Sequence, residues 1–441
     1  MIPNSNVDSV STTSGRSLQH SERQRDNKSV HRVHSTIARH PAENIVAATT
    51  ARLGKLHVQQ HTVGDATAAP APGYGDMAIV HERTAAARHH AKGFDARQRG
   101  DFRTAITEYS KAIDLDRNHF KAYFNRAFAC DKLGDLKGAI SDYLHAIKLQ
   151  PGNAYAYYNL GIVYDRSADF KQALACFSSA IDRQPQNADF HHNRGFSYRK
   201  AGDFANAIKE YTAALTINPR HFKAYYNRAF SYEKLGEHQA AVADYTQALL
   251  LDHSNANAYH NRGSSYERMG KCIEAIADFT RALQLDPLNA SSHNSRGLVR
   301  DKLRQFEEAL ADFSAAIDKE PRNPIFRHNR GYCYRNVESY EAAIIDYSTS
   351  ISLDPKSATA FNNRGFALRK LGRYREAIAD YTHSIELDPF NSKTFNNRAY
   401  SYAKLGDRAA AIADYSKTID LDPGNGHAEA GLSMLTLNTN F

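Results

Sequence analysis

Proline recurs along this chain at a constant spacing, and that spacing constrains the fold more than any other feature. Eight prolines, from Pro151 to Pro423, are separated by 34 residues, or by 68 where His253 takes the place of one. The same register runs from residue 86 to residue 425 without insertion or deletion and defines ten units. Self-similarity at such a period is typical of an array in which each unit packs only on its neighbours.

Small and aromatic residues recur at fixed positions of the unit. The eighth position is always Gly or Ala, the twentieth is always Ala, and the twenty-fourth is always Tyr or Phe. Small residues let two helices approach closely, and the ring fills the volume beside their contact. Gly at the fifteenth position of seven units predicts a helix end, and the proline stops a second helix. We therefore expect two helices of about 12–13 residues per unit.

These residues and their spacing resemble the tetratricopeptide repeat over residues 86–425. The resemblance implies an all-α fold, a right-handed α-solenoid in which helix-turn-helix pairs form a superhelix and each first helix lines the concave face. Residues 426–441 begin like one more first helix. We expect them to form a capping helix that covers the apolar face of the last unit.

Residues 1–85 have a different composition from the repeat array. They are polar, end in a Pro/Gly/Ala linker, and contain only Tyr74 of the 25 Tyr and 21 Phe in the chain. So little apolar material cannot offset the entropy of ordering, which predicts a disordered N-terminal leader. The chain has no run of about 18 apolar residues and no secretory signal pattern, so we expect no membrane insertion. Its four isolated cysteines favour a cytoplasmic protein, with cytoskeletal or ciliary association as an alternative.

Charged residues recur at two positions of the unit and change together. Where the family ordinarily has Leu at the seventh position, nine units have a base and one has Leu160. The twenty-third position is acidic in nine units and is Cys176 in the unit of Leu160. This shared exception favours ion pairs within one unit over an anion-binding or RNA-binding stripe. The bases are Lys92, Arg126, Arg194, Arg228, Arg262, Arg296, Arg330, Arg364 and Arg398, and the acids are Glu108, Asp142, Glu210, Asp244, Asp278, Asp312, Asp346, Asp380 and Asp414.

Asparagine recurs at the sixth position although it is a poor helix former. Its amide has two donors and an acceptor, which suits one peptide group of an extended chain. The row resembles the asparagine ladder in the repeat superhelix of O-linked N-acetylglucosamine transferase, which implies peptide binding. The alternative is that these amides brace the adjacent helix. The residues are Asn125, Asn159, Asn193, Asn227, Asn261, Asn329, Asn363 and Asn397.

A row of bases at the thirteenth position would border the same surface. If it lines the groove, the preferred ligand is an extended protein segment that is acidic or phosphorylated. The alternative is a solvated helix face. The family's carboxylate clamp is absent, since no unit has Lys at the fifth or Asn at the ninth position. The bases are Lys132, Arg166, Lys200, Lys234, Arg268, Lys302, Lys370 and Lys404.

No part of the sequence carries a catalytic, cofactor or metal motif. The net charge of +8 is spread thinly over the chain and forms no basic patch, so charge alone does not decide the partner. RNA-reading helical repeats use two or three side chains per unit as a variable code, whereas the groove positions here are nearly uniform, which makes nucleic acid an unlikely partner. We therefore expect a non-enzymatic protein-interaction scaffold whose concave groove binds an extended peptide segment. The alternatives are a nucleic-acid-binding helical-repeat protein and a structural or ciliary assembly component that associates through the superhelix edges.

Overall fold

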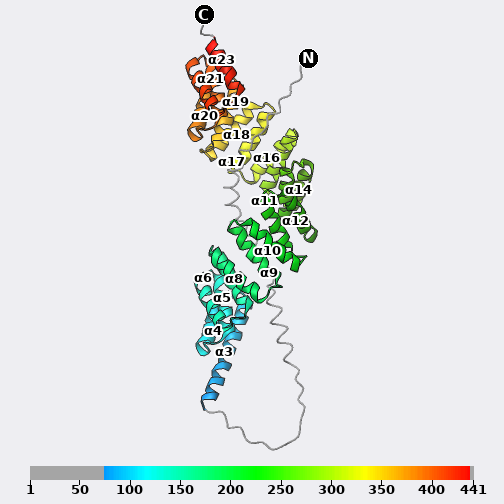
Figure 1. Ribbon diagram of the computed structural model, residues 1–441, viewed down its shortest axis with the longest axis vertical. Coiled ribbons are helices and arrows are strands. Elements are labelled where there is room, and N and C mark those ends of the chain that lie inside the picture. Colours follow the sequence, from blue (N-terminus) through cyan, green and yellow to red (C-terminus); the bar gives the residue numbers. More distant parts are fainter. Residues whose placement is uncertain (1–73, 438–441) are drawn as a thin grey trace, which may run out of the picture. The chain divides into compact units, whose positions relative to one another are not determined.

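The computed structural model describes residues 74–437, which form 21 helices and no strand (Figure 1). The chain divides into two parts, residues 1–72 and 73–441, and only the second is described below. Most of the expected leader lies outside the described residues, so its disorder stays a prediction. No helix between residues 74 and 437 is both long and apolar enough to cross a membrane.

The helices follow the 34-residue register. The first helices of successive units are α3 (Tyr74–Gln98), α5 (Phe120–Leu133), α7 (Ala154–Arg166), α9 (Ala188–Lys200), α11 (Phe222–Lys234), α13 (Ala256–Arg268), α15 (Ala290–Lys302), α17 (Pro324–Asn336), α19 (Ala358–Lys370) and α21 (Ser392–Leu405). The second helices are α4 (Phe102–Leu115), α6 (Leu136–Leu149), α8 (Phe170–Arg183), α10 (Phe204–Ile217), α12 (His238–Leu251), α14 (Cys272–Leu285), α16 (Phe306–Lys319), α18 (Tyr340–Leu353), α20 (Tyr374–Leu387) and α22 (Arg408–Leu421). A last helix, α23 (Gly426–Leu437), follows the array.

Helix α3 begins inside the segment that we expected to be leader. It starts at Tyr74, well before residue 86. The expectation was wrong over residues 74–85 because that stretch has no proline, and no glycine after Gly75, to stop a helix. Once the first unit supplies a helical nucleus, an Ala-containing segment of this kind extends it by one hydrogen bond per residue.

The recurring small and aromatic residues form the core between the two helices of each unit. A Cβ atom added to Gly161 would lie 2.8 Å from the ring of Phe177. Ala173, at the twentieth position of the same unit, is fully buried. The close helix–helix contact expected from the sequence is therefore present, and a larger residue at position 161 would push the ring aside.

The turn between the two helices uses one left-handed residue, at the fifteenth position. The seven glycines there have positive φ, for example 82° at Gly236. The other three units place Ala168, Arg304 and Glu338 in the same conformation, with φ between 60° and 62°. The glycines therefore end the first helices, as expected. In the other three units a residue with a side chain adopts the same strained backbone conformation.

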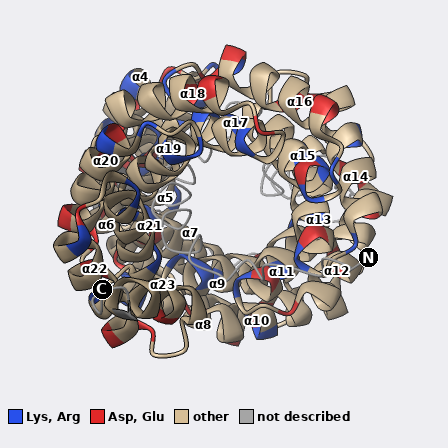
Figure 2. Cartoon of the chain, turned by 90° about the horizontal axis from the view of Figure 1, so that it is seen from above, with Lys and Arg blue, Asp and Glu red and all other residues tan. Residues whose placement is uncertain are grey.

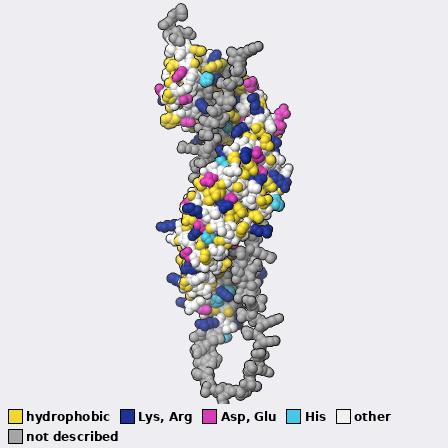
Figure 3. Space-filling model, turned by 45° about the vertical axis from the view of Figure 1, so that its right-hand side comes forward, with side chains coloured by type: hydrophobic (Ala, Val, Ile, Leu, Met, Phe, Trp, Pro, Cys, Tyr) yellow, Lys and Arg dark blue, Asp and Glu magenta, His cyan; other side chains and the backbone are white. Residues whose placement is uncertain are grey.

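The helix pairs stack into a right-handed α-solenoid in which the first helices face inward. Figure 2 shows α7, α9, α11, α13, α15, α17 and α19 on the inner side of the superhelix and the second helices, such as α10 and α16, outside them. We call the surface formed by the first helices the inner wall. On the face seen in Figure 3, hydrophobic, basic and acidic side chains are interspersed.

The last helix, α23, packs on the final unit. Leu432 and Leu435 lie against a cluster that contains Ala411 and Tyr415 of α22. These two residues would otherwise border solvent at the end of the array. Helix α23 therefore covers apolar surface of the last unit within the described residues.

Candidate functional site

The asparagine ladder connects the first helices of neighbouring units. In seven of the eight asparagines the Nδ2 atom donates to the side chain at the fifth position of the preceding unit, 35 residues earlier. The Nδ2 of Asn227 lies 3.0 Å from Nε2 of His192, and that of Asn261 lies 2.9 Å from the Tyr226 hydroxyl. The other such pairs are Asn125 with His90, Asn193 with Tyr158, Asn329 with Asn294, Asn363 with His328, and Asn397 with Asn362.

These contacts show that the ladder braces adjacent helices, while leaving part of each amide unused. An asparagine amide has two N–H donors and an oxygen with two lone pairs, and the brace uses one donor. Asn193 gives its second hydrogen to the Asp189 carbonyl, and Asn363 accepts a hydrogen bond from Arg335. Asn159 meets Tyr143 instead, because Phe124 at the fifth position has no polar atom. The ladder is half-buried, apart from the buried Asn363.

Burial makes His90, His192 and His328 neutral acceptors for the ladder. Desolvation, helped by nearby cationic groups, lowers the pKa of His90 to about 4 and that of His192 to about 3. Desolvation and then Arg335 lower the pKa of His328 to about 4. An unprotonated ring nitrogen can accept from Nδ2, so the bracing contact needs the neutral form.

The seventh-position arginines pair with the acid of their own unit, as the shared exception indicated. Nε of Arg228 lies 2.6 Å from one carboxylate oxygen of Asp244, and a second nitrogen lies 2.8 Å from the other. Such two-point contacts are strong and fix the geometry of both groups. The pairs are Arg126–Asp142, Arg194–Glu210, Arg228–Asp244, Arg262–Asp278, Arg296–Asp312, Arg330–Asp346, Arg364–Asp380 and Arg398–Asp414. In the first unit Glu108 instead accepts hydrogen bonds from His89 and Lys111, so the expected pair with Lys92 was wrong.

A hydroxyl of the preceding unit completes each of these pairs, and sequence reasoning missed it. One guanidinium nitrogen of Arg228 donates to the Thr212 hydroxyl at 2.9 Å. Every other paired arginine makes the same contact, at 2.9–3.0 Å. The sequence did contain a signal for this contact. The hydroxyl is replaced by Leu144 in the unit before Leu160, so the hydroxyl and the arginine are lost at the same junction. The hydroxyl residues are Ser110, Ser178, Thr212, Thr246, Thr280, Ser314, Ser348 and Thr382.

The basic row at the thirteenth position divides into two environments. Arg166 forms an ion pair with Asp131, and Nζ of Lys200 lies 2.7 Å from a carboxylate oxygen of Asp165. In both cases the acid stands at the twelfth position of the preceding unit. Before Lys132, Lys234, Lys370 and Lys404 that position is arginine, and the base lies over an aromatic ring, as Lys132 does 5.1 Å from the centre of Phe128. Before Arg268 and Lys302 the twelfth position is glutamate. The row therefore lies where successive first helices meet.

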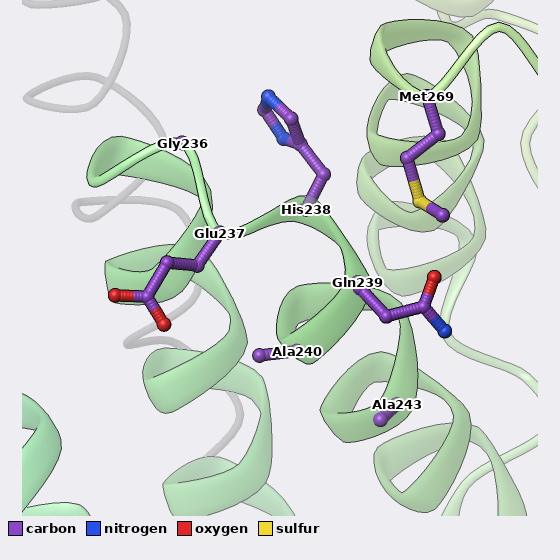
Figure 4. Close-up of a pocket in the computed structure, with 7 residues that line it drawn as sticks. All are labelled: Gly236, Glu237, His238, Gln239, Ala240, Ala243 and Met269. Atoms are coloured by element: carbon purple, nitrogen blue, oxygen red, sulfur yellow. The ribbon is translucent and has the colours of Figure 1, made fainter.

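A shallow hollow near the turn between α11 and α12 lies outside these rows. Figure 4 shows residues that line it, among them His238, Ala240, Ala243 and Met269. Nδ1 of His238 is buried without a hydrogen-bond partner among the described residues. No residue of the asparagine ladder or the basic row lines this hollow. It brings together few polar groups and does not form a site with them.

Comparisons with solved structures find helical-repeat proteins of low sequence identity. YrrB, whose structure is described as a TPR protein with an unusual peptide-binding site, is 23% identical over 42% of this chain and 96% of its own, with a TM-score of 0.38. A tetratricopeptide repeat protein from Parabacteroides merdae is 19% identical over 56% and 98%, with a TM-score of 0.45. Yeast Tom70 is 17% identical over 80% and 95%, with a TM-score of 0.37. No curated protein sequence matches the chain.

Family models match most of the repeat array. Models described as tetratricopeptide repeat match residues 154–187, 222–255, 256–289, 358–391 and 392–425. A further model, described as TPR repeat, matches residues 96–134, 130–167, 197–236 and 334–372. The first five matches coincide with whole units of the 34-residue register, and the helix pairs follow the same register in space. The chain belongs to the tetratricopeptide repeat family.

Proposed function

We propose that this chain is a non-enzymatic scaffold whose inner wall binds an extended peptide segment of another protein. The observation that carries the proposal is the asparagine ladder, which places a half-buried amide on nearly every first helix. Bracing supports this role, because a side chain already held by its neighbour loses less freedom when a ligand binds. We also propose a cytoplasmic location, since Cys130, Cys176 and Cys333 are buried single thiols.

The spacing of the ladder suits an extended chain. Packed helices lie roughly 8–10 Å apart, and an extended peptide rises about 3.3 Å per residue. One ladder amide therefore meets about every third residue of a ligand. Contacts to the ligand backbone supply affinity without selecting sequence, and side chains beside the ladder supply preference.

Acidic side chains on the same wall disfavour the nucleic-acid alternative. Asp131, Asp165 and Asp301 lie at the twelfth position of first helices, and the first two pair with Arg166 and Lys200, two bases that could otherwise contact phosphate. Phosphate binding depends on neutralising several phosphates with bases that are not already paired. Nine seventh-position bases were candidates for this role, and eight of them are paired with acids.

The test compares the full chain with the variant Asn193→Ala/Asn227→Ala/Asn261→Ala for binding to a library of synthetic extended peptides. Each alanine also removes a bracing bond worth about 1 kcal/mol, so binding is measured well below both melting temperatures. We expect the variant to bind its peptides roughly tenfold more weakly or worse. The control is Asn206→Ala on the outer helix α10, whose amide contacts Asp203. Equal peptide affinity for all three proteins would contradict the proposal.

A further inference from the structure

The twelfth position of the unit divides the inner wall into acidic and basic steps. It is acidic in Asp131, Asp165, Glu233, Glu267 and Asp301, and it is arginine in Arg97, Arg199, Arg335 and Arg369. The last two arginines follow one another on α17 and α19. The end of the array therefore differs in charge from the acidic stretch on α11, α13 and α15.

These two arginines are stacked between aromatic rings of successive first helices. The guanidinium carbon of Arg335 lies 4.1 Å from the ring centre of Tyr332 and 5.1 Å from that of Phe366. That of Arg369 lies 4.9 Å from Phe366 and 4.8 Å from Tyr400. Stacking holds each guanidinium plane by its faces. It leaves the N–H groups at the edges to bind anions, apart from the one that Arg335 donates to Asn363 and the buried Nε of Arg369.

Two lysines of the basic row extend this arrangement. Nζ of Lys370 lies 5.7 Å from the centre of Phe366, and Nζ of Lys404 lies 5.5 Å from that of Tyr400. Both lysines are exposed, and Tyr400 is 38% exposed. In the acidic steps a carboxylate occupies the place of the arginine and pairs with the next base, as Asp165 does with Lys200. On α17, α19 and α21, by contrast, the arginine at the twelfth position is followed by a lysine at the thirteenth position of the next unit, Lys370 after Arg335 and Lys404 after Arg369.

The four bases have no carboxylate partner among the described residues. No ion pair within 4.0 Å joins an acid of residues 74–437 to Arg335, Arg369, Lys370 or Lys404, and Nε of Arg369 is buried without a hydrogen-bond partner. The neutral Tyr381 phenol lies below Arg369 and does not compensate its charge. Like charges held together in this way are stabilised when an anion binds between them.

We propose that Arg335, Arg369, Lys370 and Lys404, with Phe366 and Tyr400, form a binding site for an acidic stretch of an extended peptide. We call these six residues the cationic step site. The inference rests on the proposed function and adds the chemistry and position of the preferred ligand. Because neighbouring first helices are roughly 8–10 Å apart and an extended chain rises about 3.3 Å per residue, carboxylates at every third residue would meet successive steps.

The charge of the remaining wall favours a peptide over single-stranded nucleic acid. Stacked arginines beside aromatic rings also suit nucleobases. A nucleic acid carries a phosphate on every residue, however, and would meet Glu267 and Asp301 on the next first helices. A peptide with one acidic stretch can place its uncharged part there.

The test measures binding of labelled synthetic peptides to the full chain by fluorescence polarisation at low salt. The probes are repeats of Gly-Ser-Glu, Gly-Ser-Gln and Gly-Ser-Lys, together with an oligouridylate. We expect the Glu peptide to bind most tightly, and Arg335→Gln/Arg369→Gln to weaken it roughly tenfold or more. Lys370→Gln/Lys404→Gln alters only exposed side chains and should weaken the same probe without a change in melting temperature. Added salt should weaken the interaction with the unaltered protein.

The matched control is Arg281→Gln/Arg375→Gln, which removes two exposed bases from the outer helices α14 and α20. If this control weakens the Glu peptide as much as the site variants do, general charge attraction explains the binding and the site is refuted. Tighter binding of the oligouridylate that depends on the same arginines would replace the peptide with nucleic acid. Equal binding of Glu and Gln peptides, lost only in the ladder variant, would retain the proposed function and overturn the cationic step site. If no peptide binds the unaltered chain, both proposals fail.

Discussion

At the residue scale, the seventh-position arginine joins three helices. Arg228 binds Asp244 in the second helix of its own unit and Thr212 in the second helix of the preceding unit. The two charged side chains are only 17% and 8% exposed. Removing either partner would therefore leave a poorly solvated charge, which is the costly case for an ion pair.

The first prediction concerns this pair. Arg228→Ala or Asp244→Ala should lower the free energy of unfolding by on the order of 3 kcal/mol, because the remaining charge loses its partner in a largely dry environment. Chemical denaturation of each variant measures the effect. An unfolding midpoint equal to that of the unaltered chain for either variant would show that the pair is not a stabilising contact.

The chain offers its own control, since one junction between units has apolar residues at all three positions, Leu144 in one unit and Leu160 and Cys176 in the next. Leu160 and Cys176 are buried in an apolar cluster, and Leu144, which holds the hydroxyl position, is exposed. The triple substitution Thr212→Leu/Arg228→Leu/Asp244→Cys should recover much of the stability that Arg228→Leu alone removes, because no charge is left unpaired. A triple variant less stable than the single one would contradict this account.

Which contacts could be predicted from the sequence also depends on the individual residues. The shared exception at Leu160 and Cys176 was enough to predict the ion pairs, because a pattern that changes at two positions together reports a contact. The bracing by the asparagines could not be separated from ligand binding in the same way. Their acceptors are chemically varied, His192, Tyr226 and Asn294 among them, so the pattern does not change together. The seven glycines, by contrast, predicted the turns, because a glycine that recurs at a helix end indicates the left-handed backbone conformation.

At the element scale, the turn between the two helices of a unit is the same whether or not glycine occupies it. Ala168 has φ of 62° and Gly236 has φ of 82°. A side chain in the left-handed region places Cβ near the following carbonyl, which costs roughly 1–2 kcal/mol. Three of the ten turns therefore store strain that the other seven avoid.

The second prediction is that relieving this strain stabilises the array. Ala168→Gly should raise the free energy of unfolding by up to about 1 kcal/mol, less a part lost to the greater flexibility of the unfolded chain. Gly236→Ala is the matched reverse change and should destabilise the array by a similar amount. Differential scanning calorimetry of the two variants checks both signs. If both variants melt at the same temperature as the unaltered chain, the turn conformation does not limit stability.

At the scale of the whole molecule, the buried histidines make the array sensitive to acid. Their pKa values in the folded state are lowered, to about 4 for His90 and His328 and about 3 for His192. In the unfolded chain a histidine has a pKa of about 6.5. The folded state therefore disfavours protonation, so their contribution is fully present above about pH 6.5 and is lost as the pH falls toward the folded values.

The third prediction follows from that sign. Between about pH 7 and about pH 5, each of the three histidines should lower the free energy of unfolding by at most about 2 kcal/mol. The variant His90→Asn/His192→Asn/His328→Asn should lose less stability over the same interval. Asparagine already fills this position in Asn294, where it accepts from Asn329 at 2.9 Å. Melting temperatures of both proteins across the interval test the prediction, and parallel curves would contradict it.

The bracing contacts also have a direction along the chain, and this bears on how such a protein can change in length. Every paired arginine, and every ladder amide except that of Asn159, donates toward the amino-terminal neighbour, to acceptors that recur in most units. Loss of residues 222–255 would bring Asn261 opposite His192 and Arg262 opposite Thr212, the acceptors that Asn227 and Arg228 now use. Gene rearrangements that duplicate or delete 34 codons between such units therefore create no unfamiliar junction. The length of the binding surface is free to follow the length of its ligand over evolution, while the chemistry of each junction stays the same.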